Sequence, residues 1–202
     1  MRFALSASLC AVASISAGSQ AGVVVSSDES VWGLMNAMSS LQVASESFDG
    51  FPGGLYPSLS GTTGGVQWTL TSSGGIRVGS GAAAAGSVGS SLTLSFLGGV
   101  QSFAGRFFAT DSAFAASPAL FTVTLSNGTG YSAVAASAAG FAGFTGTGGE
   151  LISSITITAM GLRDSLPVAP AVDALYFGVI PAPGSLALIS AASLLGAGRR
   201  RR

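Results

Sequence analysis

Short runs of apolar residues, separated by glycine and serine, fill the middle of the chain. Apolar and polar residues alternate in residues 66–71 and again in residues 92–96, as expected of strands that have one face in a core. Turn-forming residues recur between the runs, which is typical of antiparallel strands at regular spacing. The pattern predicts eight strands, over residues 42–48, 65–72, 91–97, 102–110, 119–126, 130–137, 151–159 and 172–178.

One helix is expected ahead of these strands. Apolar residues between Val31 and Met38 recur at helical spacing. Ser26 and Glu29 precede them with the three-residue separation of a capping box. We therefore expect a short helix over about residues 28–39 that packs through Trp32 and its methionines.

Two local segments have distinct compositions. Asn127 and Gly128 tolerate positive φ, so they predict a type I′ turn in a hairpin that follows the run 119–126. Residues 127–129 also match a glycosylation sequon, an alternative that is less favoured than the turn. Residues 79–89 contain four consecutive alanines and no periodicity, so we expect a flexible surface loop there.

The elements and the composition together predict an all-β fold. The chain has 202 residues, of which 48% are hydrophobic, 8% are charged and 30 are glycine; this disfavours both a disordered chain and a helical bundle. No internal repeat of useful length is visible, so a solenoid or propeller is disfavoured. Residues 22–178 are expected to form an antiparallel two-sheet β-sandwich, jelly-roll-like, with the short helix near its N-terminus.

Charge and reactive side chains exclude several functions. All eight basic residues are arginines, and five of them lie near the two ends of the chain, which leaves three in the middle against eight acidic residues. Nucleic-acid binding requires clustered basic residues, so it is not expected. Cys10 is the one cysteine and histidine is absent, which excludes Ser-His-Asp triads, Cys-His nucleophiles and zinc sites built on these residues.

The N-terminal residues have the order of a secretory signal. Arg2 precedes an apolar run, and small residues at Ser19 and Ala21 end it. A basic start, an apolar segment and small residues at these two positions predict cleavage by signal peptidase after Ala21. We therefore expect residues 1–21 to be a signal peptide and the protein to be exported.

The last residues combine a proline motif, an apolar segment and a basic end. Residues 185–198 are apolar, and they stand between the motif Pro181, Ala182, Pro183, Gly184 and the terminal cluster Arg199, Arg200, Arg201, Arg202. An apolar helix of this length covers about 21 Å, less than the hydrocarbon core of about 30 Å. A transient membrane association through a C-terminal helix is therefore favoured over a permanent anchor, with the arginines on the cytoplasmic side. A buried helix followed by a chance arginine run is the alternative.

This three-part order resembles the PEP-CTERM sorting signal of bacterial envelope proteins. Residues 179–202 carry the resemblance, with one departure: Ala182 stands where the motif that names the family has glutamate. The resemblance implies processing by an exosortase-like membrane peptidase and a location in the cell envelope or extracellular matrix. The middle region is similar to the β-sandwich ectodomains that accompany such tails, through residues 46–51, 103–108, 141–144, 155–158 and 171–173.

Carboxylates are the remaining candidates for acid–base chemistry or for a metal site, and they are Glu46, Asp49, Asp111, Glu150, Asp164 and Asp173. A glycosidase needs two of them across a sugar. Carboxylates in turns ordinarily cap backbone amides, which is the favoured interpretation. Asp49 and Asp173 are candidate Ca²⁺ ligands, provided that the first and last strands pair.

Exposed aromatic rings could bind a sugar, and the candidates are Trp68, Tyr56, Tyr131 and Tyr176. Trp68 is in phase with apolar neighbours, so we expect it in the core. The sequence as a whole favours an exported surface or matrix protein with a non-catalytic domain and no cofactor. A carbohydrate-binding module with an exopolysaccharide partner is the alternative, followed by a glycan-cleaving enzyme that uses paired carboxylates.

Overall fold

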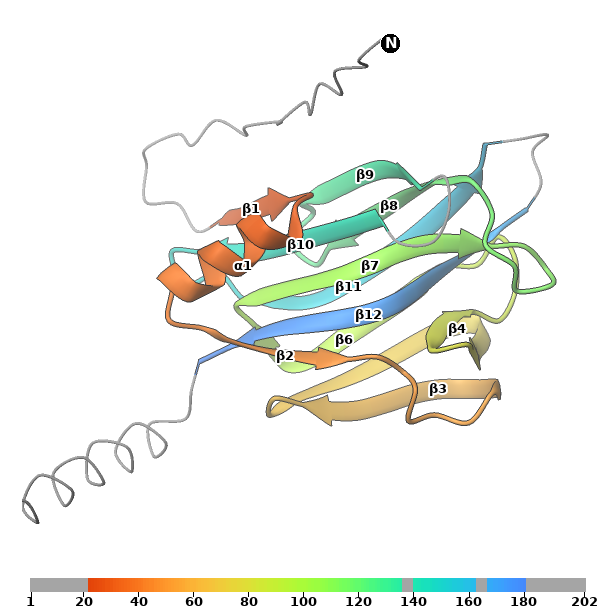
Figure 1. Cartoon of the computed structure of the whole chain (residues 1–202), viewed down its shortest axis with the longest axis horizontal. Helices are drawn as coiled ribbons and strands as arrows, with labels where there is room; N and C mark the ends of the chain where they lie inside the picture. Colours follow the sequence, from red (N-terminus) through yellow and green to blue (C-terminus); the bar gives the residue numbers. More distant parts are fainter. Residues whose placement is uncertain (1–21, 136–139, 163–166, 181–202) are drawn as a thin grey trace, which may run out of the picture.

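The computed structural model describes residues 22–135, 140–162 and 167–180 (Figure 1). The predicted signal peptide, the proline motif, the apolar segment 185–198 and the arginine cluster therefore lie outside the described residues. Within them, one helix and twelve strands follow one another: β1 (Gly22–Ser26), α1 (Glu29–Met38), β2 (Gln42–Glu46), β3 (Gly54–Thr63), β4 (Val66–Gly79), β5 (Ala82–Ala85), β6 (Leu92–Val100), β7 (Ser102–Thr110), β8 (Ala119–Leu125), β9 (Gly130–Ala135), β10 (Gly140–Thr147), β11 (Ile152–Gly161) and β12 (Ala169–Val179).

The strands form one antiparallel sheet that is curled into a nearly closed barrel (Figure 1). Its hydrogen-bonded path runs β1-β10-β7-β12-β5-β4-β6-β11-β8-β9, while β2 pairs with β12 and β3 pairs with β4 outside this path. The predicted all-β, antiparallel class with one short helix is thus confirmed. The hydrogen bonds connect all the described strands into a single sheet.

Side chains pack across the gap between the two ends of the path, where β9 faces β10, the neighbour of β1. The Tyr131 ring on β9 has its centroid 6.1 Å from that of Phe121 on β8 and 6.4 Å from that of Phe144 on β10. Val23 and Val25 of β1 pack against the same hydrophobic core. Apolar packing across this seam therefore continues the barrel wall where the hydrogen-bonded ladder ends.

Aromatic and aliphatic side chains fill the barrel interior. Phe103, Phe107 and Phe177 are fully buried, and the ring centroids of Phe103 and Phe177 lie 5.9 Å apart. Strands β4 and β6 contribute every second side chain to this core, as their apolar–polar pattern predicts. Burial of so much apolar surface is the main favourable contribution to the free energy of folding.

Helix α1 lies on the outer face of the barrel (Figure 1). The Trp32 ring packs against Phe141 of β10 at 6.0 Å and against Tyr176 of β12 at 6.2 Å, measured between centroids. A Cβ atom on Gly143 would overlap the Trp32 side chain, so glycine at this position allows the indole to approach the sheet. The helix is confirmed, and each of its bounds lies within one residue of the prediction.

The N-terminal cap of α1 differs from the expected capping box. Asp28 is the N-cap residue, and its Oδ1 accepts hydrogen bonds from Ser30 N at 2.8 Å and from Val31 N at 3.1 Å. Glu29 instead forms an ion pair with Arg106 of β7 at 2.8 Å. The capping-box prediction is wrong because the Asp28 carboxylate already satisfies the first free amides of the helix.

Each of the eight predicted strands is present, but β1, β3, β5 and β10 were not predicted. The predicted flexible loop over residues 79–89 is wrong for Ala82–Ala85, which form β5 with all four side chains buried. This strand lies between β4 and β12, with Ala83 opposite both Val78 and Val172. Alternation cannot reveal it, because both of its faces carry alanine.

The hairpin between β8 and β9 is confirmed, but its turn is not of type I′. Of the two turn residues, only Gly128 has a positive φ, of 86°. Its amide donates to the Leu125 carbonyl at 2.9 Å, and the Leu125 amide donates to the Thr129 carbonyl at 2.8 Å. These bonds define a longer loop that is closed by a left-handed glycine, another common hairpin geometry.

The barrel has two ends that carry different features. Strand β1 begins at Gly22 opposite Thr147, and β12 ends at Val179 beside β2. We call this the exit end, because the described chain both begins and ends there (Figure 1). At the opposite end, the far end, β7 finishes at Thr110 opposite Ala169 of β12.

Candidate functional site

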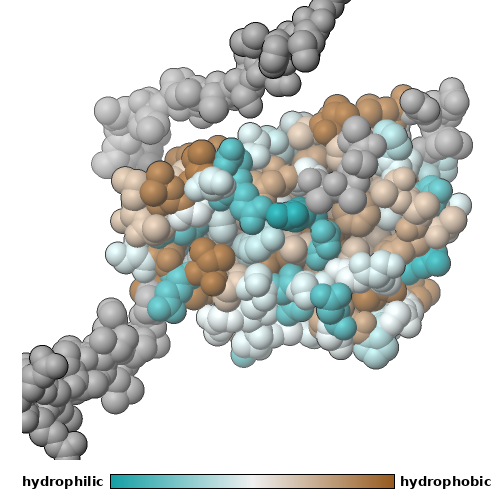
Figure 2. Space-filling view, in the orientation of Figure 1, coloured by the Kyte–Doolittle hydropathy of each residue, from teal (hydrophilic) through white to brown (hydrophobic). Residues whose placement is uncertain are grey.

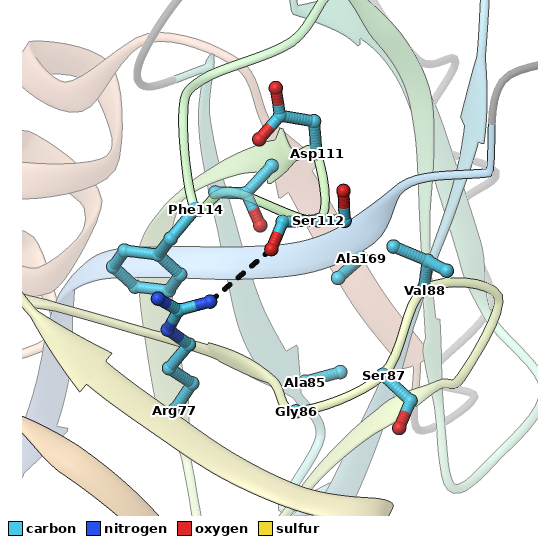
Figure 3. A pocket seen from close by; sticks show the side chains of 10 residues that line it. Arg77, Ala85, Gly86, Ser87, Val88, Asp111, Ser112, Phe114 and Ala169 are labelled. Carbon is cyan, nitrogen blue, oxygen red and sulfur yellow. Dashed lines mark hydrogen bonds between the residues drawn. The ribbon is translucent and has the colours of Figure 1, made fainter.

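A surface pocket of about 270 Å³ opens at the far end (Figure 3). The last part of β4, the residues that follow β5, the residues that follow β7 and the start of β12 form its walls. Its lining residues are Arg77, Ala85, Gly86, Ser87, Val88, Thr110, Asp111, Ser112, Phe114 and Ala169. The barrel topology thus brings together four segments that are distant in the sequence.

Arg77 supplies the positive charge of the pocket. Its Cζ lies 5.1 Å from the centre of the Phe114 ring, and its Nη1 donates a hydrogen bond to the Ser112 carbonyl at 3.3 Å (Figure 3). The ring and the carbonyl orient the guanidinium group, which has further N–H donors for another acceptor. Phe114 reaches this position with a positive φ of 67°.

Asp111 is the acidic residue of the pocket, and its carboxylate holds the local turn. Oδ1 accepts hydrogen bonds from Ala113 N at 2.8 Å and from Ala115 N at 3.0 Å. Figure 3 shows the carboxylate directed away from Arg77. Asp111 therefore caps backbone amides, which is the role that the sequence favoured for carboxylates, and it shapes the turn that carries Phe114.

Thr110 lines the same pocket at the end of β7. The residue is 1% exposed, and its Oγ1 has no hydrogen-bond partner among the described residues. A buried hydroxyl without a partner costs about 1–3 kcal/mol, but this one has less than 1 Å² of accessible surface, so a ligand in the pocket would not contact it. The exposed hydroxyl groups of the lining belong to Ser87 and Ser112. The pocket offers a guanidinium group and hydroxyl groups, which suit a small anionic or hydroxylated ligand better than they suit proton transfer.

Three further candidate carboxylates take part in hydrogen bonds at turns and strand ends. Glu46 accepts a hydrogen bond from Thr63 Oγ1 at 3.0 Å, and Asp49 accepts one from Ser47 Oγ at 2.9 Å. Glu150 accepts one from Asn127 Nδ2 at 3.1 Å. Asp164 lies outside the described residues. These contacts connect neighbouring segments of backbone, and they give the three carboxylates a structural role.

The candidate Ca²⁺ ligands approach the same level of the barrel through β2. The first predicted strand, residues 42–48, corresponds to β2, and it pairs with the last strand, β12, as the prediction required. Because Leu175 lies opposite Glu46, Asp173 is level with the segment that leads to Asp49. In the ranges that the structure describes, no three Asp, Glu, Cys or His side chains form a group that could hold a metal ion. Ca²⁺ binds about six to eight oxygen ligands, so a site with only these two carboxylates would need backbone carbonyls and water to supply most of them.

The four candidate sugar-binding aromatics lie on four different strands. Trp68 is 1% exposed, so its predicted place in the core is confirmed. Tyr131 fills the seam between β9 and β10, and Tyr176 packs against Trp32. The Tyr56 hydroxyl donates a hydrogen bond to a backbone carbonyl at 2.7 Å. Each ring thus has a packing or hydrogen-bonding role, and the described structure does not assemble them into one binding platform.

Sequence reasoning missed the pocket residues Arg77, Thr110 and Phe114. Arg77 carried a usable signal, because it is one of three arginines in the weakly charged middle of the chain. Thr110 and Phe114 carried none, since a threonine at a strand end and a phenylalanine in a turn are common in β proteins. Their proximity depends on the pairing of β7 with β12 and of β12 with β5.

No family model matches this chain, and neither a curated protein nor a solved structure does. Within residues 22–135, 140–162 and 167–180, the structure contains no helix with the length and apolar character needed to cross a membrane. Any functional inference therefore depends on the sequence and on the described side chains of this chain.

Proposed function

We propose that the protein is exported, sorted to the cell envelope and displayed at the surface or in the extracellular matrix, where its barrel domain contributes bulk or adhesion without catalysis. The signal-like residues 1–21 and the sorting-like residues 179–202 support export and sorting. Signal peptidase and an exosortase-like membrane peptidase are the proposed processing partners.

The observation that carries this proposal is the fit between the barrel and the two sequence ends. The structure describes β1 from Gly22 onward, so every described strand lies after the proposed cleavage site at Ala21, and β12 ends at Val179, shortly before Pro181. Removal of both ends would leave every described strand intact. This arrangement supports processing at both ends without loss of the fold.

The carboxylates support a non-catalytic role. Glu46, Asp49, Asp111 and Glu150 accept hydrogen bonds from hydroxyl or amide groups of the protein. Carboxylates that hold turns in place have little freedom to transfer protons to and from a substrate. The absence of histidine from the sequence removes the commonest general base.

The proposal includes a two-layer, jelly-roll-like description of the barrel. Phe107 of β7 and Phe121 of β8 belong to strands that are not hydrogen-bonded neighbours, yet their ring centroids lie 5.9 Å apart. Contact between opposite walls through interdigitating side chains is how two packed β layers form a core. It supports a flattened barrel.

Glycan binding at the pocket is a second candidate function. The Arg77 guanidinium group and the exposed hydroxyl groups of Ser87 and Ser112 line the pocket, and these donors favour a small ligand with several hydrogen-bond acceptors. An acidic sugar of an exopolysaccharide has this chemistry, because its carboxylate can form charge-assisted hydrogen bonds with a guanidinium group.

Intact mass spectrometry of the protein recovered from a native envelope fraction tests the first proposal. We expect the loss of residues 1–21 and of the segment that follows Pro183. A mass that still contains residues 199–202 would indicate an uncleaved membrane anchor. Recovery of the unprocessed chain from the cytoplasm would contradict export.

A further inference from the structure

Several exposed apolar side chains lie at the exit end of the barrel. Five of them are at least 47% exposed: Met38, Val43, Leu97, Leu151 and Ile180. Figure 2 shows hydrophobic surface over α1, on the side from which the described chain leaves the domain. We call these five residues the apolar rim.

The residues of the apolar rim belong to elements that end near one another. Met38 is the last residue of α1, Val43 lies opposite Gly178 of β12, and Ile180 follows β12 directly. On the other side of the same end, Leu151 precedes β11, whose first residue pairs with the last residue of β6. The rim therefore surrounds one end of the barrel and does not follow a single strand.

The loops at the exit end carry little charge. Among their described residues, Glu150 is the charged one, and its carboxylate accepts a hydrogen bond from Asn127. The far end also has exposed apolar side chains, Val134, Met160 and Leu162, but it carries both Arg77 and Asp111. An apolar and nearly uncharged rim fits the boundary between lipid headgroups and acyl chains.

The sequence after Ile180 limits the distance between the apolar rim and a membrane. Residues 181–184 connect Ile180 to the apolar segment 185–198. Four residues span at most about 14 Å when fully extended. If the apolar segment enters a bilayer, the exit end lies within that distance of the membrane surface.

We propose that, before the tail is removed, the exit end rests on the lipid bilayer, with the apolar rim at the headgroup–acyl boundary and the far end directed outward. This inference rests on the proposed function, because the membrane-associated tail is part of that function. The short connection selects lipid as the occupant, since it holds a bilayer next to the rim whether or not a second copy is present.

Site-directed fluorescence quenching tests this orientation. Without the signal the chain has no cysteine, so Met38→Cys and Met160→Cys each provide one thiol for a fluorophore. Met160 is the matched control, because it is an exposed methionine near the far end of β11. Protein purified with its tail from the membrane fraction is reconstituted into phosphatidylethanolamine–phosphatidylglycerol vesicles that contain a nitroxide-labelled lipid.

Quenching at position 38 is expected to exceed quenching at position 160 by roughly twofold or more, because interfacial side chains lie about 5–10 Å into the headgroup–acyl boundary. Equal quenching at both positions, or stronger quenching at position 160, would overturn the orientation. Crosslinking of two copies through position 38 without quenching would assign the rim to a second copy, and this would also overturn the proposal.

Flotation of the same vesicles separates failure of this inference from failure of the proposed function. Protein that does not float with the vesicles has no membrane-associated tail, which contradicts both. Protein that floats while position 38 remains unquenched retains the tail association, and then only the contact between the rim and the bilayer is overturned.

Discussion

Single glycines determine how closely the outer helix approaches the barrel. A Cβ atom at Gly143 would overlap Trp32, and one at Gly178 would overlap Asn36. Both side chains belong to the buried face of α1. The position of the helix therefore depends on two places in the sheet where a side chain is missing.

Gly143→Ala should lower the free energy of unfolding by about 1–3 kcal/mol, because the added methyl group overpacks the contact with Trp32. Gly33→Ala is the matched control: no atom lies within 4 Å of its Cβ position, and alanine in a helix is favoured over glycine by roughly 1 kcal/mol. Urea denaturation measures both changes. A Gly143→Ala protein as stable as the parent would contradict the close packing of α1.

Tyr131 is expected to make the free energy of unfolding decrease at alkaline pH. Burial raises the pKa of Tyr131 above the ordinary tyrosine value, because the charged phenolate is less favourable in the seam than in water. A raised pKa in the folded state gives stability that is present below the ordinary value of about 10 and is lost as the pH rises through the folded value.

The free energy of unfolding should therefore fall above about pH 10, and Tyr131→Phe should make this fall shallower. Denaturant unfolding at several pH values, with Tyr176→Phe as a comparison, measures the slope. The same slope in the parent and in Tyr131→Phe would show that Tyr131 does not contribute.

At the scale of the elements, regular alternation made some strands predictable and its absence hid others. Residues 66–71 of β4 and 92–96 of β6 alternate and were predicted as strands, whereas residues 73–79 of β4, which begin with serine and two glycines, were not. β5 consists of alanine alone, and β10 has glycine at three of its eight positions, so neither shows an apolar face in the sequence. The pocket was not predictable either, because it depends on how β5, β7 and β12 pair.

The cap of α1 illustrates a local choice that spacing alone did not settle. Asp28 and Glu29 are adjacent acidic residues. In the structure the Asp28 carboxylate accepts hydrogen bonds from helix amides, whereas Glu29 forms an ion pair with Arg106. Asp28→Ala should cost about 1 kcal/mol of stability, since it frees two helix amides. Glu29→Gln should cost less, because exposed ion pairs contribute about 0–1 kcal/mol.

Thermal or urea denaturation of the two variants tests this assignment. Both side chains of the ion pair are substantially exposed, at 41% for Arg106 and 47% for Glu29, so added salt should reduce the effect of Glu29→Gln and leave that of Asp28→Ala largely unchanged. A larger loss from Glu29→Gln would restore the capping-box interpretation.

At the scale of the whole molecule, the barrel holds two dissimilar surfaces apart. Strand β11 runs from the exit end to the far end, and its ten residues cover about 33 Å at the rise of a β-strand. The apolar rim and the polar pocket therefore stand on opposite ends of a rigid wall. A ligand in the pocket would therefore lie about one strand length away from the apolar rim.

The pocket predicts a charge-dependent interaction with acidic glycans. Arg77→Gln should weaken binding by roughly tenfold, the loss expected for one charge-assisted hydrogen bond. Arg106→Gln is the control, because this arginine pairs with Glu29 away from the pocket. Titration calorimetry against an acidic and a neutral oligosaccharide measures both variants. Equal binding by the parent and Arg77→Gln would contradict glycan binding at this pocket.

The place of β12 in the sheet has a mechanical consequence. Hydrogen bonds hold this strand on both edges, to β7 on one side and to β5 and β2 on the other. Tension applied at Ile180 along the strand axis would load these bonds in shear, all at the same time, because they run across the direction of pull. If the domain is attached through residues that follow Ile180, the attachment would therefore load the strand that is hardest to pull out of the sheet.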